Sequence, residues 1–268
     1  MKKVLLVLAI MGFFCTACEP ALSENTLQLS LGGGGTKVGL GDKIQGYYRL
    51  YWEPTDKVLC NGEVSGEALI GKRTSVAEFQ FENLPQAPYS IVFPVVEGVQ
   101  AKTTNCYPVE FLATQHYTED TFESKAAPMY CYTSKQASTL SHLTGTVRFL
   151  IKGDVTISNI VLTSDSKPIS GIFDLNCKTG EVIAQDGNTS YQAEVVFDNG
   201  FTLSPSKSTP IYFTLPAGDI GKIDVLINAT NGEKMNFFIT CDSTKPIRAG
   251  IVREVNEFEF LNTGEKNN

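Results

Sequence analysis

The segment TVRFLIKG (Thr146–Gly153) decides the fold class, because apolar residues occupy every second position along it. Val147, Phe149 and Ile151 share one face of an extended chain, and the residues between them, beginning with Arg148, lie on the other. This period of two predicts a β-strand with one face in a hydrophobic core.

Two later segments repeat the pattern. The apolar face consists of Ile223, Val225 and Ile227 in KIDVLIN, and of Met235, Phe237 and Ile239 in KMNFFIT. Between them lies the pair Asn231–Gly232, which favours the tight turn of a β-hairpin. No long segment has the period of an amphipathic helix, so the sequence predicts an all-β protein.

The N-terminal half shows the same alternation of apolar residues. TLQLSL places Leu27, Leu29 and Leu31 on one face. The segments VAEFQFE and PYSIVFPV are further expected strands. The polar stretch TSKQAST, at residues 133–139, is the best candidate for a linker between domains. We therefore expect two tandem antiparallel β-sandwich domains, one from 18 to 138 and the other from 139 to 268.

Composition excludes some functions. The chain has 268 residues, a net charge of −7 and 42% hydrophobic residues, so it can form a real core. It has no strongly basic stretch, which argues against nucleic acid as a partner. Its two histidines are too few for a His-rich metal site, and no motif indicates a metal or another cofactor.

The first 17 residues resemble an export signal. Lys2 and Lys3 precede the apolar run Val4–Phe14, which is too short to span a bilayer. Ala17 and Cys18 follow, and a small residue before cysteine is what lipoprotein signal peptidase requires. We expect cleavage between Ala17 and Cys18 and a lipid anchor on Cys18. The alternative is ordinary secretion after Ala17.

Five more cysteines follow Cys18, and an odd number leaves at least one thiol outside any disulfide. Their spacing does not specify the pairing. Buried thiols that act as small hydrophobic side chains are the simplest interpretation for most of them.

Two groups of residues raise the question of a ligand or a reaction. Tyr47, Tyr48, Tyr51 and Trp52 could form a platform on which sugar rings stack, although alternation would divide them between two faces of a strand. His116 precedes acidic residues, which suggests general acid–base chemistry. No motif places a nucleophile beside it, so we expect a protein that is not an enzyme.

Several segments, taken in order, resemble the fimbrillins, the lipoprotein pilin and fimbrial adhesin subunits of Bacteroides-type bacteria. The resemblance covers nearly the whole chain after residue 17. It rests on LYWEPTDKVLCNG (50–62), APYSIVFP (87–94), TQHYTEDTF with APMYCY (114–132), LSHLTGTVRFLIKGDVTISNIVLTS (140–164) and ISGIFDL (169–175).

The resemblance implies transthyretin-like sandwiches, a lipidated precursor at the outer membrane, and assembly with other pilus subunits by strand exchange. In that family a protease removes the first strand and a neighbouring subunit donates a replacement. The family's loop arginine is missing, since the first arginine is Arg49; Lys37 and Lys43 are the basic candidates for processing. Few residues follow Phe260, and they are mostly polar, which favours a tip or accessory adhesin over a stalk subunit.

The expected function is therefore cell adhesion or pilus assembly at the cell surface, with other subunits or surface ligands as partners. The alternative is a glycan-binding outer-membrane lipoprotein of a polysaccharide-uptake system. Coplanar, exposed rings in the aromatic group at residues 47–52 would favour that alternative.

Overall fold

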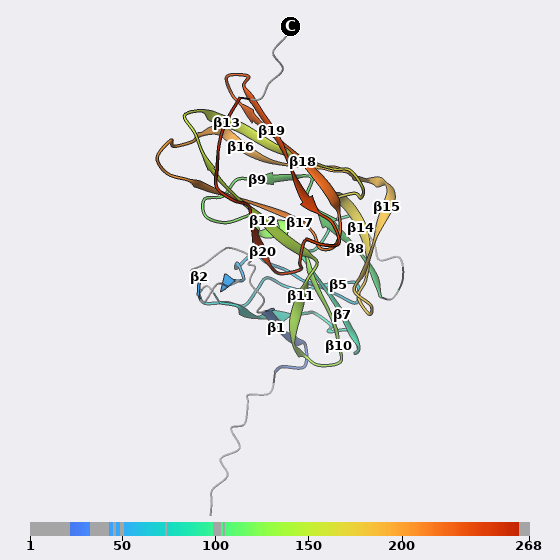
Figure 1. Ribbon diagram of the computed structural model, residues 1–268. Helices are drawn as coiled ribbons and strands as arrows, with labels where there is room; N and C mark the ends of the chain where they lie inside the picture. The colour runs from blue at the N-terminus through green and yellow to red at the C-terminus, as the bar shows by residue number, and fades with distance from the viewer. Residues whose placement is uncertain are drawn as a thin grey trace, which may run out of the picture.

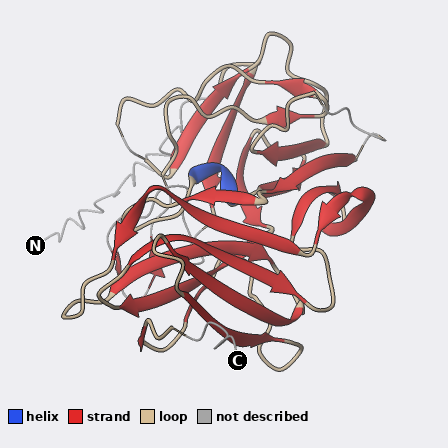
Figure 2. Ribbon diagram, turned by 90° about the horizontal axis from the view of Figure 1, so that it is seen from above, coloured by secondary structure: helices blue, strands red, loops and turns tan. Residues whose placement is uncertain are grey.

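The computed structural model describes residues 22–32, 43–44, 47–48, 51–72, 74–98, 103 and 105–262. Strands joined by loops make up their regular structure (Figure 2), and their one helical element is the short 3-10 helix η1 (Ser124–Ala126). The predicted all-β class is confirmed.

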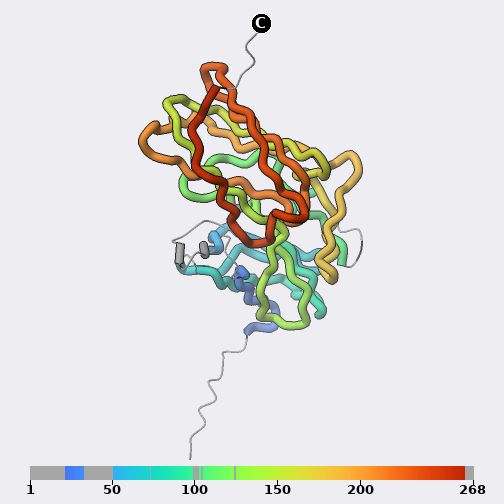
Figure 3. Tube along the Cα trace, viewed as in Figure 1, coloured from blue at the N-terminus to red at the C-terminus, as the bar shows by residue number. Residues whose placement is uncertain are grey.

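The N-terminal half is built on a seven-stranded sheet with the order β5-β4-β7-β10-β11-β1-β6. Its strands are β1 (Thr26–Leu31), β4 (Leu59–Cys60), β5 (Glu63–Val64), β6 (Val76–Gln80), β7 (Tyr89–Phe93), β10 (Met129–Thr133) and β11 (Ala137–His142). A separate pair is formed by β2 (Lys43–Ile44) and β3 (Tyr47–Tyr48). Figure 3 traces this half as the blue-to-green part of the chain.

The C-terminal half contains a five-stranded sheet with the order β19-β18-β13-β16-β9. Its strands are β9 (Thr114–His116), β13 (Thr156–Ser164), β16 (Gln192–Thr202), β18 (Gly221–Ala229) and β19 (Lys234–Cys241). A second sheet consists of β12 (Thr144–Lys152), β17 (Thr209–Pro216), β20 (Val252–Glu254) and β21 (Phe258–Glu259), with β12 between β17 and the two C-terminal strands. Side chains of both sheets share one core cluster.

A three-stranded sheet links the halves, with β14 between β15 and β8. Its strands are β8 (Cys106–Phe111), β14 (Ser170–Asn176) and β15 (Glu181–Ser190). The expected domain boundary, between 138 and 139, falls inside β11, which pairs with β1 and β10. Since β8 and β9 precede that boundary and pair with β14 and β16, strand pairs cross it. The division into two domains stays a prediction.

The alternation in the C-terminal half is confirmed. The six residues expected to point inward are all fully buried: Val147, Phe149, Ile151, Ile223, Val225 and Ile227. The Asn231–Gly232 turn also joins the antiparallel strands β18 and β19, and Gly232 has a φ of +88° that favours glycine.

The alternation of β1 is confirmed as well, because Leu27, Leu29 and Leu31 are all buried. On the neighbouring strand β6 the inward residues are Ala77 and Phe79, whereas Val76 is 40% exposed. Val76 and Phe79 stand at positions of opposite parity, so one extended strand cannot bury both on the same face.

Four of the five cysteines that follow Cys18 behave as core residues. Cys60, Cys131, Cys177 and Cys241 are buried free thiols. Burial raises the pKa of Cys60 to about 12 and that of Cys131 to about 11, so both stay protonated at neutral pH. The interpretation of these four as small hydrophobic side chains is confirmed.

Candidate functional site: the slot of the first strand

The first strand lies inside its sheet. β1 pairs antiparallel with β6, where Leu27 faces Phe79, and parallel with β11, where Leu29 faces Ser138. Figure 1 shows β1 next to β11 at the lower end of the molecule. Since β6 joins the sheet only through β1 among the described strands, β1 holds two segments together that are distant in sequence.

The apolar face of β1 fills the centre of the N-terminal core. Leu27 and Leu29 are completely buried in a cluster that includes Phe79 and Leu140. The indole Nε1 of Trp52 donates a hydrogen bond to the Leu29 carbonyl oxygen at 3.1 Å. A chain without β1 would expose this apolar surface and leave the buried indole N–H without its acceptor.

The end of β1 also fits tightly against β11. An added Cβ on Gly32 would lie 2.5 Å from the carbonyl oxygen of Leu140, so only glycine allows this approach. On the polar face, the Ser30 hydroxyl lies 2.6 Å from that of Thr139. The packing at the end of β1 therefore requires a glycine at position 32.

Two titratable groups with shifted pKa values lie in the same half. Burial raises the pKa of the Asp56 carboxyl to about 6, although it accepts the backbone N–H of Glu53 at 2.8 Å. Burial lowers the pKa of His142 to about 4, because desolvation disfavours the charged ring. Neither residue was singled out from the sequence, because nothing in the local pattern indicates the burial of a charged group.

An edge in the C-terminal half is closed by a side chain. Gln115 is 2% exposed, its Nε2 donates to the Thr214 carbonyl oxygen at 2.9 Å, and its Oε1 accepts the Thr214 N–H at 3.0 Å. The amide thus satisfies the backbone groups that β17 would otherwise offer to an added strand. Strand addition at this point of the C-terminal half is blocked.

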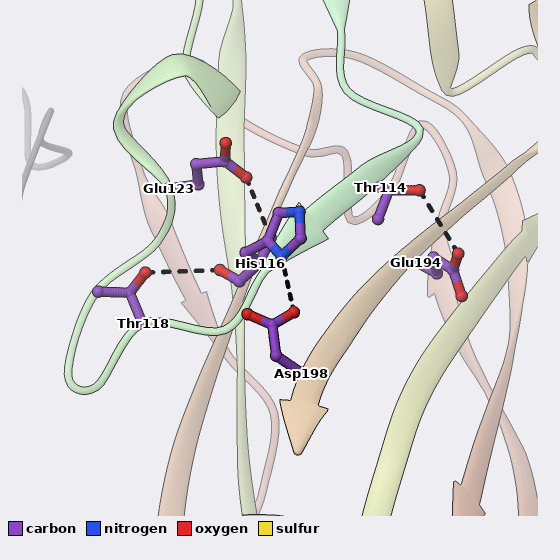
Figure 4. A network of polar contacts seen from close by, with 6 residues as sticks. All are labelled: Thr114, His116, Thr118, Glu123, Glu194 and Asp198. Atoms are coloured by element: carbon purple, nitrogen blue, oxygen red, sulfur yellow. Dashed lines mark hydrogen bonds and ion pairs between the residues drawn. The ribbon is translucent and has the colours of Figure 1, made fainter. Parts of the chain in front are cut away.

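The sequence analysis also raised His116, which lies in an exposed network (Figure 4). Its Nδ1 is 3.1 Å from Oδ1 of Asp198, and its backbone N–H donates to Glu123. The side chains of His116 and Asp198 are 55% and 72% exposed. The ring nitrogens bond no hydroxyl or thiol of the described residues, so the network ties β9 to β16 without the geometry of an activated nucleophile.

The aromatic group expected to stack sugars is divided. Trp52 is completely buried and packs edge-on against Phe79 and Phe93, so it is removed as a stacking surface. Tyr51 is half-buried. Tyr47 and Tyr48 form β3, and their side chains lie outside the described part of the structure.

The processing and anchoring residues are placed only in part. Lys43 begins β2 and pairs with Tyr48, whereas Ala17, Cys18 and Lys37 lie outside the described residues. Within the described ranges, no three histidine, cysteine or acidic side chains gather where they could hold a metal ion. No helix in the same ranges has the length and hydropathy needed to cross a membrane.

Comparison with solved structures places this architecture among known folds. A candidate cell adhesion protein from Bacteroides ovatus superposes with a TM-score of 0.50 at 11% sequence identity, over 87% of this chain and 91% of that one. The chain has a fimbrillin-like fold. No protein-family model matches the sequence, and no curated protein matches it.

Matches with lower TM-scores come from related bacteria. A candidate cell adhesion protein from Bacteroides fragilis has a TM-score of 0.39 at 10% identity, over 85% of this chain and 91% of that one. A tip fimbrial protein from Porphyromonas gingivalis has a TM-score of 0.34 at 8% identity, over 80% of this chain and 81% of that one.

Proposed function

We propose that the chain is a surface-exposed, lipid-anchored fimbrillin-like subunit that acts in cell adhesion as a tip or accessory component of a pilus. Its two halves would act as tandem transthyretin-like sandwiches, and it would join other subunits by strand exchange. The observation that carries the proposal is the interior position of β1, between β6 and β11.

Strand exchange follows from what β1 covers. Its removal leaves unpaired N–H and C=O groups on β6 and β11, together with an apolar groove over Phe79 and Trp52. A donor strand would relieve both costs at once, because it supplies backbone partners and apolar side chains. The donor must carry apolar residues at alternate positions, as β1 does with its three leucines.

Processing would cut the chain after β1, at Lys37 or Lys43. A protease needs an extended substrate with unpaired backbone, and Lys43 is paired with Tyr48 in the β2–β3 ladder. We therefore favour Lys37, with Lys43 cut only after β2 and β3 separate.

Limited trypsin digestion of the folded protein tests the proposal. Mass spectrometry should detect a cut at Lys37, and release of a peptide that contains Leu27–Leu31 should create a binding site for a synthetic β1 peptide. A peptide with serine at the three leucine positions is the matched control and should not bind. Lys37→Gln should abolish the early cut, whereas Lys43→Gln should leave it. Cleavage without release, or release followed by irreversible unfolding, would overturn strand exchange.

The anchor needs a separate test in the native host. Cys18→Ala should move the protein out of the membrane fraction, whereas Cys15→Ala should leave it there. Retention of the Cys18→Ala variant in the membrane would refute the proposed lipid attachment.

A further inference from the structure

A small pocket lies beside the start of β12, under the loop that connects β19 to β20. Its volume is about 280 Å³. Three cationic side chains line it, together with apolar ones from the same loop: Lys245, Arg248, Arg253, Pro246, Ile247 and Ile251.

The charge of this pocket opposes that of the chain. The net charge is −7, yet no carboxylate lines the pocket. In the described structure none of its three cations forms an ion pair with a carboxylate. Two carboxylates are nearby in sequence. That of Glu254 pairs with Arg148 at 2.8 Å, and Oδ1 of Asp242 accepts the Thr244 hydroxyl at 2.6 Å and the Thr244 N–H at 2.9 Å. These bonds to Thr244 chiefly lower the pKa of Asp242, and the backbone N–H and the charge of Lys245 add to the effect, so this carboxylate is used within the loop and offsets part of the charge of Lys245.

One of the three cations is held in place. Nη1 of Arg253 donates to the carbonyl oxygens of Thr240 at 2.7 Å and Lys245 at 3.1 Å, and it lies 3.3 Å from the Cys241 sulfur. Nη2 and Nε form no hydrogen bond within the described residues. The guanidinium is therefore fixed by the protein and keeps donors for an incoming anion, which lowers the entropic cost of binding.

The loop itself is fixed against β12. An added Cβ on Gly145 would lie 2.3 Å from the Arg248 carbonyl oxygen, so this approach requires glycine. Ile247 and Gly218 exchange two backbone hydrogen bonds, of 2.7 and 2.9 Å, and the Gly250 N–H donates to the Thr144 carbonyl oxygen at 2.8 Å. These contacts hold the backbone that carries Lys245 and Arg248.

We propose that this pocket binds the carboxylate of an acidic monosaccharide unit. Guanidinium groups bind carboxylates in a bidentate geometry, and the ammonium of Lys245 adds a point charge. The side chains of Pro246 and Ile251 offer apolar contact to the C–H groups of a sugar ring. The volume is slightly below that of pockets for drug-sized ligands, as expected for one sugar unit. The acid could be a sialic acid or a uronic acid, which share this chemistry.

This inference deepens the proposed adhesive function, on which its biological meaning rests, by naming a ligand class. Isothermal titration of the intact, uncut chain should detect binding of N-acetylneuraminic acid, of glucuronic acid, or of both, with Kd values of about 1 mM. Separate titrations with the two compounds distinguish a sialic acid from a uronic acid as the ligand. Glucose should not bind, and inorganic phosphate should bind more weakly than the sugar acid. Equal binding of phosphate would mean a general anion site and would overturn the proposal.

Variants test whether the binding measured by titration takes place in this pocket. The double variant Lys245→Gln/Arg248→Gln should weaken binding by about tenfold or more. The matched control Lys135→Gln/Lys178→Gln removes the same charge from exposed positions elsewhere and should bind normally. Gly145→Ala should weaken binding without any change in charge, because it displaces the loop. Arg253→Lys should also weaken binding, because it removes the guanidinium that the protein holds in place. Thermal unfolding of each variant checks that it is folded.

Unchanged binding by folded Lys245→Gln/Arg248→Gln would refute the site. No sugar-acid binding by the intact chain would also refute it, and would leave the trypsin test of strand exchange untouched. Binding without strand exchange would keep the pocket and reject the assembly mechanism.

Discussion

The two halves of the molecule build their hydrophobic cores in different ways. The C-terminal half uses long strands, such as the 9 residues of β12 and the 11 of β16, whose neighbours cover one continuous core. The N-terminal sheet has strands of 2 to 6 residues, and its core is completed by β1 from the far end of that half of the chain. The comparison teaches that the C-terminal core is built mainly from long strands, whereas the N-terminal core depends on one short strand, β1.

The largest expected effect is in the C-terminal half. Phe149→Ala removes a completely buried ring at the centre of β12 and should lower the free energy of unfolding by about 3–5 kcal/mol. Chemical denaturation followed by circular dichroism measures this loss. A loss below about 1 kcal/mol would show that the site is not part of a close-packed core.

Leu29→Ala should have the next largest effect, about 2–4 kcal/mol, in the other half. Trp52 is the chain's single tryptophan and bonds to the Leu29 carbonyl, so its fluorescence reports on the N-terminal core. If the halves differ as described, Leu29→Ala shifts the fluorescence transition more than the circular dichroism transition. Phe149→Ala should do the reverse. Equal shifts by both probes would make the two halves one cooperative unit.

Asp56→Asn should stabilise the N-terminal half by about 1–2 kcal/mol at pH 7. The carboxyl has a pKa of about 6 in the folded protein against an ordinary value of 3.8. The folded state therefore binds the proton more tightly, and stability is lost as the pH rises from about 4 through 6. Asparagine keeps an acceptor for the Glu53 N–H and carries no charge. The Trp52 transition, measured at pH 4.5 and pH 7.5, should lose this pH dependence in the variant.

Gly232→Ala should have the smallest effect, a loss of about 1 kcal/mol, because alanine is strained at a φ of +88°. An added Cβ there would meet no neighbour, so the cost is conformational. The circular dichroism transition should move while trypsin release of β1 stays as in the parent. A change in β1 release would show that the halves are coupled through the β18–β19 hairpin.

Local patterns predicted a large part of this fold. The period of two identified the inward residues of β12, β18 and β1, because alternation follows from the geometry of one strand. The same reasoning could not place β1 in parallel beside β11, since pairing between distant segments leaves no local trace. Nor could it reveal that Gln115 closes the edge of β17, because that depends on two strands far apart in sequence.

Local sequence patterns also predicted only part of the candidate sites. The leucines of β1 and the lysines after it were evident from the sequence, as were the tyrosines near Trp52. The burial of Trp52 was not evident, because alternation alone does not say which face of a short strand meets the core. The basic pocket was also missed. Lys245, Arg248 and Arg253 are separated by apolar and small residues, and only the folded loop brings them together.

The most direct test of the central claim, that β1 is a replaceable strand, is the emission of Trp52 in the trypsin-cut protein. Release of β1 removes the Leu29 acceptor and uncovers the indole, so the emission should shift to the red. Addition of the synthetic β1 peptide should return it to the blue, and the serine-substituted peptide should not. A red shift that no peptide reverses, or cleavage that leaves the emission unchanged, would contradict the account.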